Sequence, residues 1–278
     1  MLIDTHSHLN FTAFKEDFDK VIKNCLENNV WMINVGSQYT TSKKAVEIAE
    51  RYEKGIYAAV GIHPIHLSAG IFKTKINKEE IEFQTREEEF DEEKYKSLAK
   101  SKKVKAIGEI GLDYYYRPKT KKKLELFKEK QKESFLKQLK LAKELNLPII
   151  FHCRMAHQDL LEILQRPAFS NLKGVIHCFT GNFEQAEKYL KMGFYLGFNG
   201  IIFKKIEGID FMEIIKKTPL DKILIETDCP YLTPPQIKGR NEPLYVKYVA
   251  EKIAQIKNMS YEEIAEITTK NAKKLFAI

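Results

Sequence analysis

The sequence predicts an α/β protein: a TIM-like (β/α)8 barrel formed by residues 1–278 as a single domain, with an added helix at the C-terminus. Eight short apolar runs recur along the chain, and amphipathic helical patterns fill most of the gaps between them. Several runs are nearly continuous Val, Ile and Leu, which is typical of parallel strands buried on both faces. A length of 278 residues suits one barrel, and no Pro/Ser-rich linker or internal repeat marks a second domain.

The order of the elements follows from these patterns. The predicted strands are Leu2–Thr5, Val30–Val35, Ile56–Gly61, Val104–Gly108, Leu147–Phe151, Gly174–Ile176, Phe194–Phe198 and Lys222–Glu226. Apolar residues at helical spacing predict helices over Phe14–Glu27, around Ala45–Tyr52 and over Leu124–Leu145. Ser260 and Glu263 form a capping-box pattern, so the added C-terminal helix is expected over Ser260–Phe276.

Composition and charge bound the class of protein. Hydrophobic residues make up 44% of the chain, as in soluble globular proteins. The formal net charge of +8 favours anionic partners such as nucleic acid, and it is equally compatible with plain solubility. The four cysteines form no CxxC pair and are too sparse for a disulfide framework, so buried reduced thiols are expected. With no visible signal peptide and no membrane-spanning run, we expect a cytoplasmic protein without membrane association, and a monomer by default.

Two charged runs interrupt the pattern. Between Glu79 and Glu93 lie nine acidic residues and one Arg, which we interpret as a solvated insertion or helix face. Between Lys119 and Lys143 lie ten lysines, partly balanced by glutamates. This second run is either a solvated helix or part of a surface that attracts phosphate groups.

Polar residues follow five of the predicted strands, where barrel enzymes place their reacting groups. The segments are DTHSH at 4–8, GEIGLD at 108–113, HCR at 152–154, HCFTG at 177–181 and ETDCP at 226–230. His6 and His8 alternate along a strand and share one face, so both imidazoles can point at one ion. His152 and His177 end consecutive strands; each alone could be a core histidine, but together they are expected to be metal ligands. Imidazole and carboxylate suit zinc, manganese or iron, with magnesium possible where oxygen ligands dominate.

A resemblance follows from the ordered motifs IDTHSH, GIHP, GEIGLDYYY, IIFHCR, HCFTG, ETDCPYLTP and RNEP, which lie between residues 2 and 243. Together they resemble the TatD family of metal-dependent deoxyribonucleases, whose barrels are of the amidohydrolase type, over essentially the whole chain. The resemblance implies two divalent ions (zinc, magnesium or manganese). It assigns His6, His8 and Asp228 to the first ion, His152 and His177 to the second, and Glu109 to a bridge between them. It further implies that His63 contacts the substrate phosphate, and that Arg154, Arg240 and Asn241 are candidate phosphate or base contacts.

The expected catalytic residues are Asp228, Glu109 and His63. Two cations activate a water, and Asp228 is expected to orient that water and accept its proton. His63 either stabilises the phosphate or assists the leaving group, unless it is only a turn histidine before Pro64. Asp4 and Glu226 either orient imidazoles or are polar residues of the barrel interior. Five aromatic residues could stack on unpaired bases or belong to the edge of the core: Tyr114, Tyr115, Tyr116, Phe179 and Tyr231.

Three functions remain open at this point. The leading hypothesis is a nuclease that cleaves phosphodiester bonds of DNA, from the 3′ end of single strands, with nucleic acid as its partner. The same metal site could instead attack an ester, amide or lactone, which includes aminoacyl-tRNA deacylase activity. A nucleic-acid-binding scaffold with structural metals is the third, and the mixed nitrogen and oxygen ligand set argues against it because structural zinc sites are closed and thiolate-rich.

Overall fold

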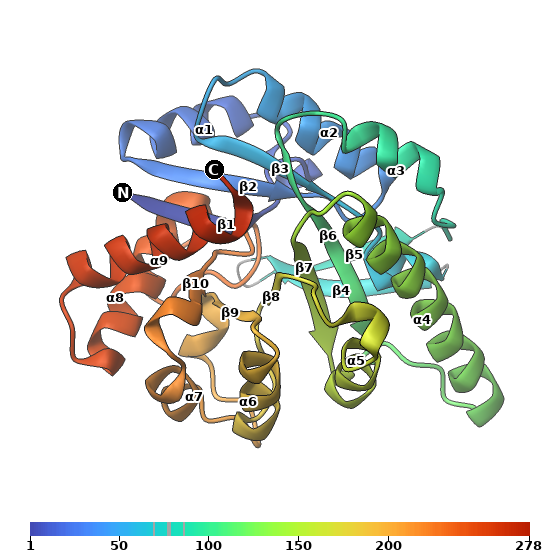
Figure 1. Ribbon diagram of the computed structural model, residues 1–278. Coiled ribbons are helices and arrows are strands. Elements are labelled where there is room, and N and C mark those ends of the chain that lie inside the picture. The colour runs from blue at the N-terminus through green and yellow to red at the C-terminus, as the bar shows by residue number, and fades with distance from the viewer. Residues whose placement is uncertain (69, 77–78, 86) are drawn as a thin grey trace.

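The barrel forms as predicted. The computed structural model describes residues 1–68, 70–76, 79–85 and 87–278, with 70–76 and 79–85 described by their backbone. Within these residues, eight parallel strands form a sheet in the order β1-β2-β3-β6-β7-β8-β9-β10, which curls into a nearly closed barrel with helices around it (Figure 1). The barrel strands are β1 (Leu2–Ser7), β2 (Val30–Val35), β3 (Ile56–Val60), β6 (Val104–Asp113), β7 (Ile149–Arg154), β8 (Gly174–Ile176), β9 (Tyr195–Phe198) and β10 (Ile223–Ile225). The helices are α1 (Phe18–Glu27), α2 (Tyr39–Glu50), α3 (Glu92–Leu98), α4 (Lys121–Glu144), α5 (His157–Leu164), α6 (Phe183–Lys191), α7 (Phe211–Lys217), α8 (Val246–Lys257) and α9 (Tyr261–Phe276).

The strand β6 differs most from its prediction, because it continues past Gly108 to Asp113. Gly111 permits this: a Cβ there would lie 1.9 Å from the backbone oxygen of His152 on β7, so only glycine allows the two strands to approach so closely. Gly111 and His152 are register partners, as are Asp113 and Arg154. Glu109 therefore lies within a strand rather than after it.

The barrel closes where β1 meets β10. The backbone contact at this seam is a single parallel bridge between Ser7 and Cys229. Side chains supply further bonds across it: the carboxylate of Asp4 accepts from the backbone N–H (2.8 Å) and the hydroxyl (2.5 Å) of Thr227, and the hydroxyl of Thr5 donates to the carbonyl of Ile225 at 3.1 Å. The segment that carries Asp228 is thus fixed to the strand that carries His6.

The added C-terminal helix α9 is confirmed, with the predicted capping box at Ser260 and Glu263. Alternate strand residues fill the barrel interior with small and branched apolar side chains, including Ile33, Ala106 and Val175. Leu275 and Phe276 of α9 belong to the same buried cluster. The hydroxyl of Thr269 on this helix donates to the carbonyl of Met1, so α9 lies at the end of the barrel where β1 begins (Figure 1). The other end, where the strands finish, is left for the polar residues.

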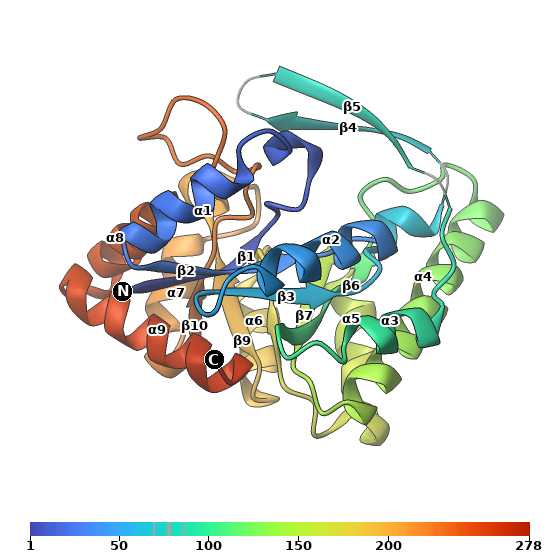
Figure 2. The same ribbon diagram turned by 90° about the horizontal axis from the view of Figure 1, so that it is seen from above.

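The acidic insertion contains two strands that were not predicted. β4 (Gly70–Ile76) pairs antiparallel with β5 (Glu79–Thr85), with Phe72 opposite Phe83 in the register. Figure 2 shows this hairpin standing away from the body of the barrel. Helix α3 follows it, capped by the side chain of Asp91. In the described parts of the chain, no helix is long and apolar enough to cross a membrane.

Candidate metal centre

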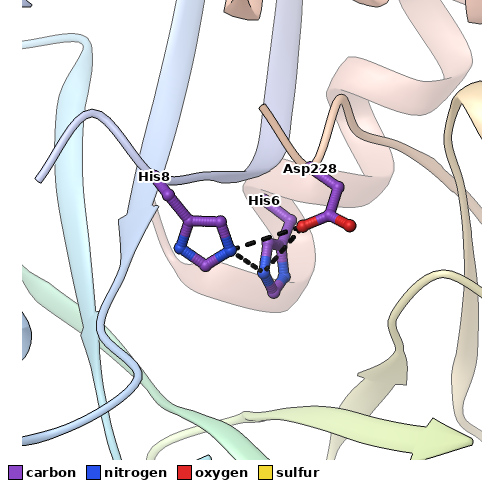
Figure 3. Close-up of side chains that lie close together, drawn as sticks. All are labelled: His6, His8 and Asp228. Atoms are coloured by element: carbon purple, nitrogen blue, oxygen red, sulfur yellow. Dashed lines mark hydrogen bonds and ion pairs between the residues drawn. The ribbon is translucent and has the colours of Figure 1, made fainter. Parts of the chain in front are cut away.

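Six side chains converge at the carboxyl ends of the barrel strands. We call them the histidine–carboxylate cluster: His6, His8, Glu109, His152, His177 and Asp228. Figure 3 shows three of them pointing at one another. The Nε2 atoms of His6 and His8 lie 3.1 Å apart, and Oδ1 of Asp228 lies 3.3 Å from Nε2 of His8 and 3.8 Å from Nε2 of His6. These three residues are close enough together to hold one metal ion.

Glu109 lies between this group and the other two histidines. Its Oε2 is 3.4 Å from Nε2 of His6, and its Oε1 is 2.6 Å from Nδ1 of His152 and 3.8 Å from Nε2 of His177. Glu109 is buried, so its charge has few partners other than these nitrogens. One carboxylate therefore contacts both sets of imidazoles, which is the arrangement that a bridging ligand requires.

Three of the four histidines present one ring nitrogen to this pocket and have an oxygen atom close to the other ring nitrogen, whereas Nδ1 of His6 has no partner among the described residues. Nδ1 of His8 lies 2.8 Å from the carbonyl oxygen of Val35, which can only accept, so the hydrogen is on Nδ1 and the lone pair of Nε2 faces the pocket. Nδ1 of His177 lies 2.9 Å from Oε1 of Glu226, and Nε2 of His152 lies 3.1 Å from Oδ2 of Asp113. Outer acceptors of this kind orient metal-binding imidazoles in proteins. The donor set and its orientation fit divalent cations.

The charges of the cluster are strongly coupled. Burial alone would raise the pKa of Glu109, but the imidazoles of His63, His6 and His152 outweigh it and hold that pKa well below its usual range. Burial opposes the charged form of His152 as well, yet the carboxylates of Glu109 and Asp113 raise its pKa to about 9. For His177, Glu226 and Asp228 likewise overcome burial and raise the pKa to about 10. In the absence of metal, the ionised carboxylates of the pocket are therefore stabilised by protonated imidazoles. A bound metal ion would supply the same positive charge.

The backbone is strained at the end of β10. Asp228 has a φ of 58°, a conformation uncommon outside glycine. Its N–H donates to the carbonyl of His6 at 2.8 Å, which fixes the carboxylate beside β1. Cys178, after β8, also has a positive φ, of 44°. Such conformations concentrate at functional sites because the surrounding structure must hold them in place.

Asp113 is a site residue that the sequence did not single out, although it ends the GEIGLD segment. It forms a group with His63 and His152 that is close enough to hold a metal ion. Nε2 of His63 points toward the same region, 3.6 Å from Oε1 of Glu109. The described structure thus extends the cluster to one more carboxylate and one more imidazole.

The comparisons with known proteins agree with this geometry. The sequence model of the family described as TatD related DNase matches residues 3–277. The chain belongs to the TatD family. It is 43% identical over 281 residues to the uncharacterized metal-dependent hydrolase YabD of Bacillus subtilis, covering all of both chains. It is 31% identical to a protein of Erwinia amylovora named 3′-5′ ssDNA/RNA exonuclease TatD, again covering all of both chains.

Solved structures support the same placement. The crystal structure of YJJV, a TatD homologue from Escherichia coli K12, superposes with a TM-score of 0.83 at 27% identity, covering 100% of this chain and 98% of that one. This TatD-family protein is accordingly a metal-dependent hydrolase that acts on ester bonds.

Three predicted substrate contacts of the TatD-family chain have different surroundings. Arg154 ends β7 beside the cluster, and its guanidinium carbon lies 3.6 Å from the ring centre of Tyr115. Arg240 lies in the loop after β10; it pairs with Asp17 at 2.7 Å and Glu242 at 3.0 Å. The buried amide of Asn241 donates to the carbonyls of Thr227 and Tyr231. Arg240 and Asn241 therefore brace the loop that presents Asp228. Of these two arginines, Arg154 is the one that makes no ion pair with any residue that the structure describes.

The contacts of Asp4, Glu226 and the aromatic residues bear on the alternative roles that the sequence left open for them. Glu226 contacts an imidazole, whereas Asp4 binds the backbone of His6 at 3.2 Å and both donors of Thr227. Tyr114 and Phe179 are buried and belong to the core. Tyr115 is 50% exposed, although the guanidinium of Arg154 and the ring of Tyr116 both pack against it.

Proposed function

We propose that this TatD-family hydrolase cleaves phosphodiester bonds of single-stranded DNA from the 3′ end, using two divalent ions held by the histidine–carboxylate cluster. The observation that carries the proposal is the double contact of Glu109, which links the His6, His8 and Asp228 group to His152 and His177. Relatives named 3′-5′ ssDNA/RNA exonuclease in Erwinia and Pantoea support the substrate class. Zinc, magnesium and manganese all suit the ligands. A cytoplasmic location and a monomeric state stay predictions from the sequence.

The cluster divides into two ion-binding groups under this proposal. His6, His8 and Asp228 would hold one ion, His152 and His177 the other, and Glu109 would contact both. Bound in pairs, such ions lower the pKa of a water from 15.7 to about 7 and offset the charge that builds up on a phosphoryl oxygen. Oδ1 of Asp228 lies 3.3 Å from Nε2 of His8. Under this proposal, the other carboxylate oxygen, Oδ2, would orient the attacking water and accept its proton.

The tautomer of His63 bears on its proposed contact with the substrate phosphate. Its Nδ1 accepts a hydrogen bond from the backbone N–H of Ile65 at 3.0 Å, so a neutral ring carries its hydrogen on Nε2. Burial, together with the neighbouring charge of His152, lowers the pKa of His63 to about 3, so the ring is neutral at physiological pH. Because Nε2–H faces the pocket, His63 is placed to donate to a non-bridging phosphate oxygen.

Replacement of the proposed base tests this function. Asp228→Asn should lower the rate of DNA cleavage by at least about 100-fold, since general-base catalysis typically contributes about 10² to 10⁴. Asparagine tolerates a positive φ, so the fold should be retained. The measurement is the product ladder from a 5′-labelled single strand, after chelation and re-addition of zinc, magnesium or manganese singly. Asp221→Asn, an exposed carboxylate at the start of β10, is the matched control.

The same preparations distinguish the other chemistry. Each metal-loaded sample is assayed in parallel on aryl esters, lactones and aminoacyl-tRNA. Cleavage of esters without cleavage of DNA would contradict the nuclease proposal and favour a carbonyl substrate. Undiminished DNA cleavage by Asp228→Asn would remove that residue from the mechanism.

A further inference from the structure

Five cations lie between the end of β6 and the first turn of α4. They are Arg117, Lys119, Lys121, Lys122 and Lys123, and all five are exposed. None makes an ion pair with any residue that the structure describes, whereas some exposed lysines on other helices pair with glutamates four residues away, as Lys188 does with Glu184. Their charge is therefore available to a ligand.

The stability of α4 does not explain this charge. The positive end of a helix dipole favours acidic side chains, yet the first turn of α4 contains none, and Thr120 makes no side-chain cap. Helix α9 of the same chain follows the usual pattern, with a capping box at Ser260 and with Glu262 and Glu263 in its first turn. The lysines of α4 lie where the helix dipole does not favour positive charge, so the stability of the helix does not account for their position.

A stacked pair of Arg154 and Tyr115 lies between these cations and the histidine–carboxylate cluster. The guanidinium of Arg154 stacks on Tyr115, and no acidic group in the described structure pairs with it. The N–H of Tyr115 donates to Oδ1 of Asp113 at 2.8 Å, while Oδ2 of Asp113 lies 3.1 Å from His152. The stacked pair is thus one residue contact away from the cluster. Lys121 follows Tyr115 by six residues, which limits the separation of their backbones to about 20 Å.

We propose that the α4 basic rim, defined as the five cations together with Arg154 and Tyr115, binds the single strand that continues from the scissile phosphodiester. The inference rests on the proposed function and adds where the strand runs. The cations contact successive phosphates, and the Arg154–Tyr115 stack carries one unpaired base. A half-exposed ring fits an unpaired base because a base inside a duplex has no free face.

Charge removal from the rim is the first test. The triple variant Lys121→Gln/Lys122→Gln/Lys123→Gln should weaken the binding of labelled oligo(dT), measured by fluorescence anisotropy, by at least tenfold at low salt. The slope of log K against log salt should fall by about 2, because each phosphate contact on a single strand contributes about 0.7. Lys270→Gln/Lys273→Gln/Lys274→Gln on α9 makes the same change of charge at the opposite end of the barrel and should leave both quantities unaltered.

Removal of the ring is the second test. Tyr115→Ala should weaken oligonucleotide binding by about tenfold without changing the salt slope, since stacking is not electrostatic. In turnover assays, the rim variants should lose at least fivefold more kcat/KM on oligo(dT) than on bis(p-nitrophenyl) phosphate, which has no strand to bind. Equal losses on both substrates, or an unchanged salt slope in the triple lysine variant, would overturn the proposal.

Binding is measured on the Asp228→Asn protein as well as on the parent, so that it does not depend on turnover. A parent protein that cleaves no phosphodiester but loses oligo(dT) binding in the rim variants would contradict the proposed function and support the rim. If the parent cleaves DNA but the rim variants bind oligo(dT) as tightly as the parent, the proposed function is supported and the role of the rim is contradicted.

Discussion

The acceptors behind the site histidines set which nitrogen each ring offers to a metal. Glu226 is the most connected of them: its Oε1 lies 2.9 Å from Nδ1 of His177, and it also accepts from the N–H of Cys178 at 2.6 Å and the amide of Asn199 at 3.1 Å. Its Oε2 has no partner among the described residues, and Gly197 leaves the space it occupies, since a Cβ there would lie 2.5 Å away. Glu226 therefore contacts His177 at Nδ1, on the other side of the ring from the Nε2 atom that faces Glu109.

Glu226→Gln tests this role. The substitution keeps the shape and one accepting oxygen but removes the charge that favours the orientation of His177. We expect the affinity for the ion bound by His152 and His177 to fall by about 10- to 100-fold, with little change in secondary structure. Metal titration by calorimetry after chelation measures this. Glu213→Gln, an exposed glutamate on α7, is the control, and equal metal affinity in Glu226→Gln and the parent would show that Glu226 is only a buried polar residue.

The partners of individual residues were harder to predict than the residues themselves. His6, His8, His152 and His177 could be proposed because polar segments at strand ends must meet at one end of a barrel. The choice of Glu109 and Asp228 among the carboxylates of those segments came from the resemblance to the TatD family. The outer acceptors depend on ring orientation, which no spacing in the sequence specifies. The partner of Arg240, Asp17, is 223 residues away and precedes α1, so no local pattern could have indicated that pairing.

The elements themselves were predicted well where they are buried on both faces. All eight barrel strands lie where the apolar runs predicted them, because such runs have few alternatives in a parallel sheet. The β4–β5 hairpin was not predicted, because the many acidic residues of its second strand indicate a solvated segment more strongly than they indicate a strand. The extension of β6 to Asp113 was missed because it depends on a close approach at Gly111 that is visible only in three dimensions.

At the seam between β1 and β10, the strands are joined by a single backbone bridge, and the side chain of Asp4 adds hydrogen bonds across it. Burial raises the pKa of the Asp4 carboxyl well above its usual range, despite the hydrogen bonds from Thr227, which favours the neutral form of the group in the folded protein. Asp4→Ala should lower the free energy of unfolding by about 3 kcal/mol, because three buried donors lose their acceptor. Asp4→Asn keeps a neutral acceptor of the same shape and should cost about 1 kcal/mol or less.

Urea unfolding followed by circular dichroism measures both Asp4 variants. The comparison matters more than either value, since the alanine variant also leaves a small cavity. If Asp4→Asn proved as destabilised as Asp4→Ala, the carboxyl would have to be ionised when folded, and the neutral state inferred from its burial would be wrong.

At the scale of the whole molecule, the metal centre ties the barrel together. Its six residues come from β1, β6, β7 and the segments after β1, β8 and β10, so ions held there would link strands on both sides of the seam. The other end is closed by α9, whose Leu275 and Phe276 pack into the barrel interior. Apolar packing thus stabilises one end of the barrel, and we expect the stability of the other end to depend on metal and pH.

Metal removal should therefore make stability depend on pH in a defined direction. Without metal, the folded-state pKa of His152 is about 9 and that of His177 about 10, both above the value of about 6.5 for an unfolded histidine. Groups with raised pKa values contribute stability that is fully present below pH 6.5 and is lost as the pH rises through 9 to 10. The metal-free protein should accordingly show a Tm that falls between pH 6.5 and pH 10.

The metal-loaded protein should respond in the opposite sense, because the ion and the protons compete for the same nitrogens. The difference in Tm between loaded and metal-free protein should therefore grow as the pH rises from 6.5 toward 10, at a fixed free concentration of zinc or manganese. Thermal unfolding by calorimetry across this range measures it. Lysines, tyrosines and thiols also titrate near pH 10, so the double variant His152→Gln/His177→Gln supplies the reference. A metal-free parent whose Tm changes with pH no more steeply than that of the double variant would show that these two imidazoles are not protonated in the folded chain.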